Sequence, residues 1–414
     1  MKDGDKVTAL VRLTSLVHTK GGIRLSIRGE LKKERKTLIL LTSDFLVRTP
    51  DPLRPFFEKK IFEEATRVEE VPQTDGVRWE EMNLSPTSNE SYSLASKDLN
   101  PIHTDPLFAA MAGLSPEASG QVIPICHGMG SAALTLSALL KKIPQPVQRW
   151  ETHFVGTVQP NKELTIEAEH VANKNGCPVF AVVTQQEGHP VLTGRVTFEP
   201  KKTAYLFTGQ GSQQPRMGME AYERSEVARS VWDQSDAYCR QKLGFSILEV
   251  VRNNPKEILV EGQRISHPKG VLHLTQFTQV GLTVLAMAQT AELKQAGIYN
   301  NKASFAGHSL GEYAALSCSG IIPLEEVIQS VYHRGLTMQH FVPRNKEGRS
   351  PYGMGVVRPK LVGWSETVLE EKIEALRKKS GEIYLVNYNI EDSQYAVTGE
   401  LKVLKELEKE LTEL

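Results

Sequence analysis

The residues best suited to acid–base chemistry lie in one short loop of this 414-residue chain. Asp98 precedes His103 by five residues, and Pro101 restrains the backbone between them. An imidazole titrates near neutral pH, so this pair can move protons at a fixed place. Further along, Gly128 opens an apolar helix, where free backbone N–H groups can polarise a carbonyl. These residues fit elimination or addition of water beside a thioester carbonyl, with His103 handling the α-proton and Asp98 the hydroxyl.

An isolated pair with this spacing is more often structural than catalytic. Asp98 and Asn100 would then form Asx turns, and His103 would be an ordinary loop histidine. The neighbouring residues make the pattern more specific, because D-x-N-P-x-H-x-D-P is followed by two further motifs. These are A-x-x-x-G at 109–113 and P-I-x-H-G at 124–128.

Together these motifs resemble the MaoC-like family of R-specific enoyl hydratases and dehydratases, which have hot-dog folds. The resemblance covers about 91–200. It implies that Asp98 and His103 are the catalytic pair, and that the Gly128 N–H holds the enolate-like oxygen.

A second set of residues suits nucleophilic catalysis. Ser309 lies in Gly307-His308-Ser309-Leu310-Gly311, between a predicted strand at 304–306 and a predicted helix from Glu312. A serine in a tight turn between strand and helix is the context of a nucleophile elbow. The N-terminus of the helix favours a developing oxyanion there.

Three other features accompany this elbow. Gly209-Gln210-Gly211-Ser212-Gln213 follows the first strand of the region, Thr278-Gln279 lies in a predicted helix, and Arg334 comes 25 residues after Ser309. The set resembles the malonyl/acyl transferases of fatty acid and polyketide synthases. That resemblance implies ping-pong transfer, in which Ser309 takes the acyl group from CoA and a carrier-protein thiol receives it.

The same resemblance assigns roles to the surrounding residues. It implies an oxyanion hole from the backbone of Gln210 and Leu310, a carboxylate clamp at Arg334 and an active-site glutamine at Gln279. A bidentate guanidinium suits the free carboxylate of malonate. His308 is not the base in that family, whose catalytic histidine follows the small subdomain. We therefore expect an incomplete transferase whose histidine lies beyond Leu414, and a chain that is an internal fragment.

The order of elements predicts a mixed α+β and α/β chain. Strand-like alternation fills 7–70, and one apolar helix is followed by four strands up to about 200. Alternating strands and helices then predict a parallel sheet. With the two resemblances, we expect a degenerate hot-dog half at 1–75, an active hot dog at 76–202 and an acyltransferase domain at 203–414. The last includes a small ferredoxin-like α+β subdomain at about 350–414, with the domain cut at its C-terminus.

Composition excludes several classes of protein. Lys+Arg and Asp+Glu are both 49, which argues against binding nucleic acid or a membrane surface through bulk charge. No apolar stretch is long enough to predict a membrane span. The four cysteines show neither metal-ligand spacing nor a disulfide framework, so we expect no metal and a cytoplasmic location.

The order of the two motif sets, a hot-dog dehydratase before a malonyl/acyl transferase, resembles the β subunit of fungal-type fatty acid synthase. This implies no cofactor in the fragment, with substrates carried on CoA and on the phosphopantetheine of acyl carrier protein. FMN and NADPH would belong to other domains, and the α subunit and further β subunits would complete a large hetero-oligomer. Two alternatives remain open: a serine esterase or thioesterase of the α/β-hydrolase type, and a non-catalytic scaffold segment.

Overall fold

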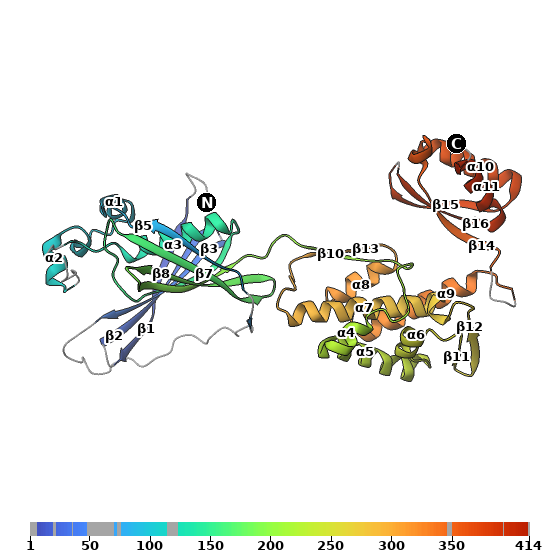
Figure 1. The fold of residues 1–414 in the computed structure, drawn as a ribbon, viewed down its shortest axis with the longest axis horizontal. Coiled ribbons are helices and arrows are strands. Elements are labelled where there is room, and N and C mark those ends of the chain that lie inside the picture. Colours follow the sequence, from blue (N-terminus) through green and yellow to red (C-terminus); the bar gives the residue numbers. More distant parts are fainter. Residues whose placement is uncertain are drawn as a thin grey trace. The chain divides into compact units, whose positions relative to one another are not determined.

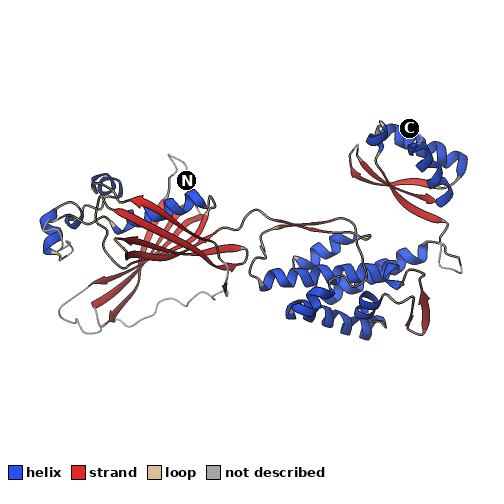
Figure 2. Cartoon of the chain, in the orientation of Figure 1, coloured by secondary structure: helices blue, strands red, loops and turns tan. Residues whose placement is uncertain are grey.

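The computed structural model describes residues 6–19, 22–34, 36–47, 70–72, 76–113, 123–345, 350–391 and 393–412. Figure 1 traces the chain along its sequence, and Figure 2 shows the same view by secondary structure. The chain divides into two compact units, Met1–Glu69 and Glu70–Leu414. Both helices and strands are abundant, which confirms the predicted mixed architecture.

The described part of the first unit is an antiparallel three-stranded sheet in the order β1-β2-β3. Its long strands are β1 (Thr8–Thr19), β2 (Gly22–Lys33) and β3 (Lys36–Val47). A degenerate hot-dog half at 1–75 stays a prediction, because 48–69 and 73–75 lie outside the described residues. The compact unit ends at Glu69, before the predicted boundary.

The second unit begins with a six-stranded antiparallel sheet in the order β4-β7-β8-β9-β6, with β5 also paired to β7. Its strands are β4 (Val71–Pro72), β5 (Arg78–Leu84), β6 (Val147–Phe154), β7 (Glu163–Lys174), β8 (Cys177–Gln186) and β9 (His189–Phe198). Because β4 pairs with β7, it lies in this sheet although the predicted boundary assigned it to the preceding half.

Among the described residues, three α-helices accompany the sheet: α1 (Glu90–Ser96), α2 (Pro106–Met111) and α3 (Gly128–Lys142). Buried and half-buried residues alternate along β8, because successive side chains of a strand point to opposite faces. The α3 residues Ala138 and Leu139 pack against buried side chains of β7, β8 and β9. The sheet therefore folds around this helix, as the single apolar helix among strands predicted.

The transferase-like region follows from residue 204. Its strands β10 (Ala204–Phe207) and β13 (Ser304–Gly307) pair in parallel, as predicted, while β11 (Glu257–Val260) and β12 (Gln263–Ser266) form an antiparallel ribbon. Its helices are α4 (Met219–Arg224), α5 (Glu226–Tyr238), α6 (Ile247–Asn253), α7 (Thr275–Gln295), α8 (Leu310–Cys318) and α9 (Leu324–Phe341).

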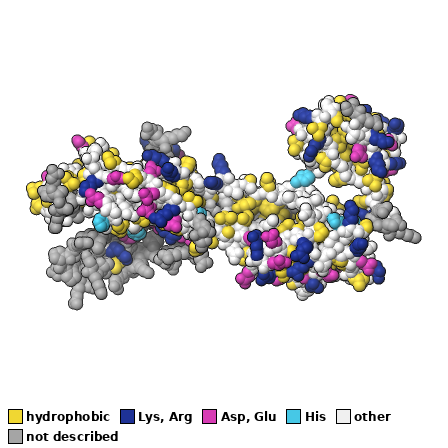
Figure 3. Space-filling view, in the orientation of Figure 1, with side chains coloured by type: hydrophobic (Ala, Val, Ile, Leu, Met, Phe, Trp, Pro, Cys, Tyr) yellow, Lys and Arg dark blue, Asp and Glu magenta, His cyan; other side chains and the backbone are white. Residues whose placement is uncertain are grey.

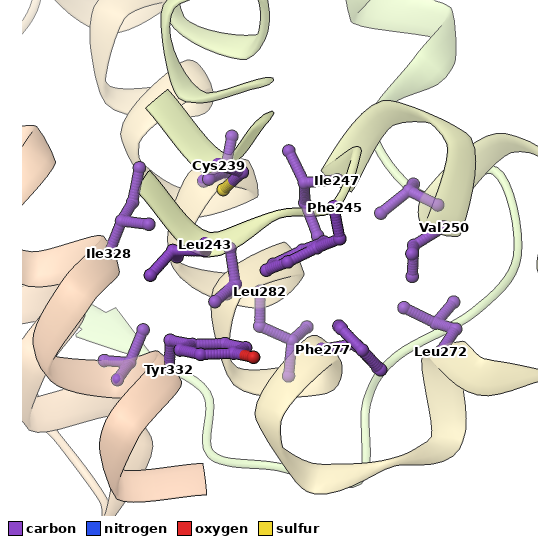
Figure 4. Packing of buried hydrophobic residues seen from close by; sticks show 14 of the residues in the cluster. Cys239, Leu243, Phe245, Ile247, Val250, Leu272, Phe277, Leu282, Ile328 and Tyr332 are labelled. Atoms are coloured by element: carbon purple, nitrogen blue, oxygen red, sulfur yellow. The ribbon is translucent and has the colours of Figure 1, made fainter. Parts of the chain in front are cut away.

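A continuous apolar core holds these helices together. Figure 4 shows the side chains of Phe245, Phe277 and Tyr332 gathered in one region of it. The Phe245 ring lies 4.9 Å from that of Phe277 and 5.3 Å from that of Tyr332. The core joins α7 to α9, and these two helices carry residues predicted for the transferase site.

A small α+β part ends the chain. Its sheet has the order β14-β16-β15. Two helices pack against this sheet, and their buried residues share one apolar cluster with those of the strands. The elements are β14 (Tyr352–Val357), α10 (Glu366–Ser380), β15 (Ile383–Ile390), β16 (Gln394–Glu400) and α11 (Leu401–Thr412). This is the predicted sequence of strand, helix, strand, strand and helix.

The surface agrees with the balanced composition. Figure 3 shows cationic and anionic side chains intermixed over the visible face. In the described part of the chain, no helix has both the length and the apolar character needed to cross a bilayer.

Candidate active sites

The loop that carries Asp98 and His103 is built from two consecutive capped turns. The Asp98 carboxyl accepts a hydrogen bond from Asn100 N–H, and the Asn100 side chain accepts one from Ile102 N–H. Pro101 begins the 3₁₀ turn that ends at His103. An Asx side chain suits the cap position because its oxygen accepts a hydrogen bond from a free backbone N–H. Proline suits the first position of the turn because it has no backbone N–H that would need a partner. The motif therefore has a structural reason as well as a chemical one, and the Asx turns considered from the sequence are present.

The turns bring the predicted pair together. Potential ligand atoms of Asp98, His103 and His127 all lie within 4.8 Å of one another. The Asp98 side chain is half exposed, whereas His103 is 9% exposed. A half-exposed carboxyl beside a largely buried imidazole can exchange protons with water while the imidazole remains in a fixed orientation.

Hydrogen bonds define the tautomer of His103. Its Nδ1 lies 2.9 Å from the carbonyl oxygen of Ile125, which can only accept, so Nδ1 carries the proton. The neutral ring therefore has its lone pair on Nε2. The buried Asn89 amide donates to the carbonyls of both His103 and Ile125, each at 2.9 Å, and joins the two segments.

His127 is a residue of this site that the sequence analysis left without a role. Its ring stacks on His103 with centroids 3.9 Å apart, and its Nε2 lies 3.1 Å from the backbone oxygen of Asp98. The P-I-x-H-G motif contained the signal, but spacing alone does not place this ring on His103. The three residues of the cluster could also act as metal ligands. Because His127 Nε2 already donates to an oxygen, metal binding there would have to displace that contact.

Gly128 occupies the first position of α3, where helix N–H groups have no intrahelical acceptor. A Cβ at this position would meet the Phe154 ring at 3.2 Å. Glycine therefore lets the helix start approach an aromatic wall while its N–H stays available, which fits the predicted oxyanion donor.

Burial raises the pKa of two neighbouring groups, Tyr92 and Cys126. Desolvation, followed by the Asp98 charge, raises the pKa of Tyr92, whose ring lies 4.8 Å from that of His127. Burial raises the pKa of Cys126 to about 11. Both groups are therefore neutral at physiological pH.

The serine elbow has the backbone that its motif predicts. Ser309 has φ 56° and ψ −108°, a conformation that side chains seldom adopt and that is typical of strained functional turns. A Cβ on Gly307 would lie 2.1 Å from the Gly311 carbonyl, and one on Gly311 would lie 2.2 Å from the Phe207 oxygen. The glycines are therefore required for α8 to begin directly at the ends of β10 and β13.

Arg334 reaches the nucleophile from α9. Its Nη2 donates to Ser309 Oγ at 3.1 Å, and its guanidinium carbon lies 5.5 Å from the centroid of the Tyr313 ring. Helix α9 can approach α7 closely because Gly335 has no side chain: a Cβ there would lie 2.5 Å from Gln276 Cα. The predicted clamp is therefore beside the predicted nucleophile.

The two glutamines also meet. Gln279 is fully buried, and its Nε2 lies 3.5 Å from Gln210 Oε1. Gln279 Oε1 has no hydrogen-bond partner among the described residues, which leaves a buried acceptor for a bound group. Leu310, whose backbone was predicted to help form the oxyanion hole, is the first residue of α8. The Nε2 of His308 lies 3.1 Å from Asn389 Oδ1.

Comparisons with known proteins find a family model for each of the two regions. An acyl transferase domain model matches residues 204–412, half of the chain, and a MaoC like domain model matches 67–189. The chain therefore belongs to the acyl transferase domain family and has a MaoC like domain before that region.

More particular relatives are fungal. Fatty acid synthase subunit beta of Schizosaccharomyces pombe is 34% identical over 375 residues, covering 78% of this chain and 18% of the relative. The same subunit of Saccharomyces cerevisiae is 35% identical over 372 residues, again covering 78% and 18%. The predicted resemblance to fungal-type β subunits is thereby confirmed, and the chain spans 18% of the length of these relatives.

A bacterial structure is also similar. Malonyl CoA-acyl carrier protein transacylase from Clostridium perfringens has 30% identity and a TM-score of 0.40, covering 51% of this chain and 58% of that chain.

Proposed function

We propose that the hot-dog region dehydrates (3R)-3-hydroxyacyl thioesters to trans-2-enoyl thioesters. His103 Nε2 takes the α-proton, the electron pair forms the Cα–Cβ double bond, and the C–O bond breaks. The acid form of Asp98 gives its proton to the leaving hydroxyl, which departs as water. The Gly128 N–H stabilises the enolate-like oxygen of the thioester.

The observation that carries this proposal is the convergence of Asp98 and His103. Their reactive groups lie within 4.8 Å of one another, and the Nδ1–H bond to Ile125 leaves His103 Nε2 as the basic nitrogen. A purely structural loop would not need this nitrogen to be available beside a half-exposed carboxyl. Both features are expected for an acid–base pair with separate tasks.

The decisive test follows enoyl thioester formation. The chain is mixed with a 3R-hydroxyacyl thioester and, separately, with the 3S isomer, and the conjugated product is measured by its ultraviolet absorbance. We expect turnover of the 3R isomer and its loss in Asp98→Asn. A folded chain that does not dehydrate the 3R substrate, or an Asp98→Asn variant with full activity, would contradict the proposal.

We further propose that the second region forms an acyl-Ser309 intermediate from malonyl or other acyl-CoA and passes the group to acyl carrier protein. Arg334 supports this, because its guanidinium donates to Ser309 Oγ and can pair with a substrate carboxylate nearby. The backbone N–H groups of Gln210 and Leu310 form the oxyanion hole in this proposal. Ester hydrolysis, the alternative considered from the sequence, does not use the arginine.

Mass spectrometry of the intact chain tests the second activity. Because none of the described residues is assigned as the base of Ser309, incubation with malonyl-CoA is expected to add one malonyl group slowly, over a long incubation, and Ser309→Ala abolishes the addition. No covalent adduct would contradict acyl transfer by this chain. In the same proposal, the remaining partners are those of a fatty acid synthase: acyl carrier protein, CoA thioesters, the α subunit and further β subunits. The location would be the cytoplasm, and FMN and NADPH would serve other domains.

A further inference from the structure

We propose that His127 is a positioning residue of the dehydration site, fixing the Asp98 loop and the His103 ring relative to each other. The inference rests on the proposed dehydration but concerns a residue outside its proton transfers. Its basis is that one buried imidazole contacts both members of the pair, through a different interaction in each case.

The contact with His103 is a ring stack. The two imidazoles lie 3.9 Å apart between centroids with an interplanar angle of 27°. His127 is only 2% exposed and is the residue that precedes the first turn of α3, so its ring is attached to the buried helix. Because the His103 ring stacks on this buried ring, it cannot rotate freely. The orientation of His103 Nε2 is therefore fixed.

The contact with Asp98 is a hydrogen bond to its backbone. His127 Nε2 lies 3.1 Å from the Asp98 carbonyl oxygen and 3.3 Å from Ser93 Oγ, while the Asp98 carboxylate is farther, at 3.9 Å. A carbonyl only accepts, so Nε2 carries the proton of the neutral ring. The bond ties an exposed loop to a buried helix start, and the carboxylate moves with that loop.

Packing alone does not account for an imidazole here. His127 Nδ1 is buried and has no hydrogen-bond partner among the described residues. Burying a polar atom without a partner costs free energy, and an apolar ring would avoid that cost. The N–H on the far side of the ring is what an apolar ring would lack, and that N–H binds the Asp98 loop.

Two amide variants separate this role from a general need for polarity. In His127→Gln, the longer side chain can place an N–H near the former Nε2 and reach the Asp98 carbonyl. In His127→Asn, the amide is one methylene shorter and cannot. His170→Asn is the matched control, because His170 also stacks on an aromatic ring, that of Phe180, and bonds to Asn173 on the same sheet.

The readouts are kcat and KM for a 3R-hydroxyacyl thioester, together with the thermal midpoint of each variant. Displacement of a catalytic group by about 1 Å can cost about a hundredfold in rate. We expect His127→Asn to lower kcat by about that factor with KM changed less than about threefold, because the defect lies in orientation rather than binding. His127→Gln is expected to recover most of kcat, and His170→Asn to match the wild type.

The outcomes distinguish the inference from the function on which it rests. Wild-type chain without dehydration contradicts the proposed function. Two results with an active wild type would overturn the role of His127 alone. One is an unchanged kcat in folded His127→Asn, and the other is an equal loss of kcat in the Gln and Asn variants. If His127→Asn does not fold, His127→Gln decides, because a folded Gln variant that has lost a hundredfold or more in kcat also overturns the role.

Discussion

Replacing His103 with asparagine should remove the base of the proposed dehydration and leave the loop intact. The Nδ2–H of asparagine occupies nearly the place of the imidazole Nδ1–H and can donate to the Ile125 carbonyl, which the imidazole contacts at 2.9 Å. That carbonyl also accepts from Asn89 at 2.9 Å, so it stays paired even if the new contact is imperfect. The variant removes the basic Nε2 and the ring face that stacks on His127, and it keeps the contact made by Nδ1.

The expected magnitudes differ sharply between rate and stability. A positioned general acid or base contributes about 10²- to 10⁴-fold in rate, and each tenfold step corresponds to about 1.4 kcal/mol of activation free energy. The barrier should therefore rise by about 3–6 kcal/mol. The free energy of unfolding should fall by no more than about 3 kcal/mol, the sum of one ordinary hydrogen bond and one ring stack.

The assay measures kcat for the 3R-hydroxyacyl thioester and the denaturant midpoint of the same preparations. His103→Ala is the control, because it removes both the base and the hydrogen bond and should lose slightly more stability. Retention of a tenth or more of wild-type kcat in folded His103→Asn would refute the assignment of Nε2 as the base. A loss of activity that merely follows unfolding would refute the argument that the asparagine preserves the loop.

Three further outcomes are expected. Arg334→Lys should reduce the ratio of malonyl to acetyl loading of Ser309, measured by mass spectrometry, by about ten- to a hundredfold. The reason is that one charge-assisted hydrogen bond of a bidentate pair is lost. An unchanged ratio would count against Arg334 as the carboxylate clamp. Gly307→Ala should destabilise the elbow by about 3 kcal/mol in denaturant unfolding, because its Cβ would lie 2.1 Å from the Gly311 carbonyl; a wild-type midpoint would contradict this. Burial raises the pKa of Cys126 from 9.0 to about 11, so the folded chain retains a proton that the unfolded chain releases, and stability falls as pH rises from 9 to 11. Cys126→Ala should flatten that decline in thermal midpoint, and an identical slope would exclude the thiol as a contributor.

Much of the fold follows from local sequence patterns. Alternation of apolar and polar residues predicts the strands of the hot-dog sheet, and the apolar run at 131–140 predicts the helix that the sheet encloses. The strand before Gly307 and the helix after it likewise predict the elbow at Ser309. Such patterns are readable because strand and helix periodicities impose different spacings on buried residues.

The pairing of strands far apart in the sequence was harder to predict. The two-residue strand β4 is too short for a periodic signal, and its place beside β7 depends on a register set by tertiary contacts. The predicted boundary after residue 75 falls inside the second compact unit, which starts at Glu70. A composition change marks a connector, but hydrogen bonding to a distant strand decides which unit the connector joins.

The sequence by itself determined which residues are chemically competent, because Asp98, His103 and Ser309 lie in motifs whose spacing constrains short loops and turns. Only the tertiary structure decided how these side chains are oriented toward their partners. The stack of His127 on His103 and the bond from Arg334 to Ser309 each join residues more than twenty positions apart. Such contacts arise from the packing of whole helices and segments, since no local pattern encodes the direction in which two distant side chains meet.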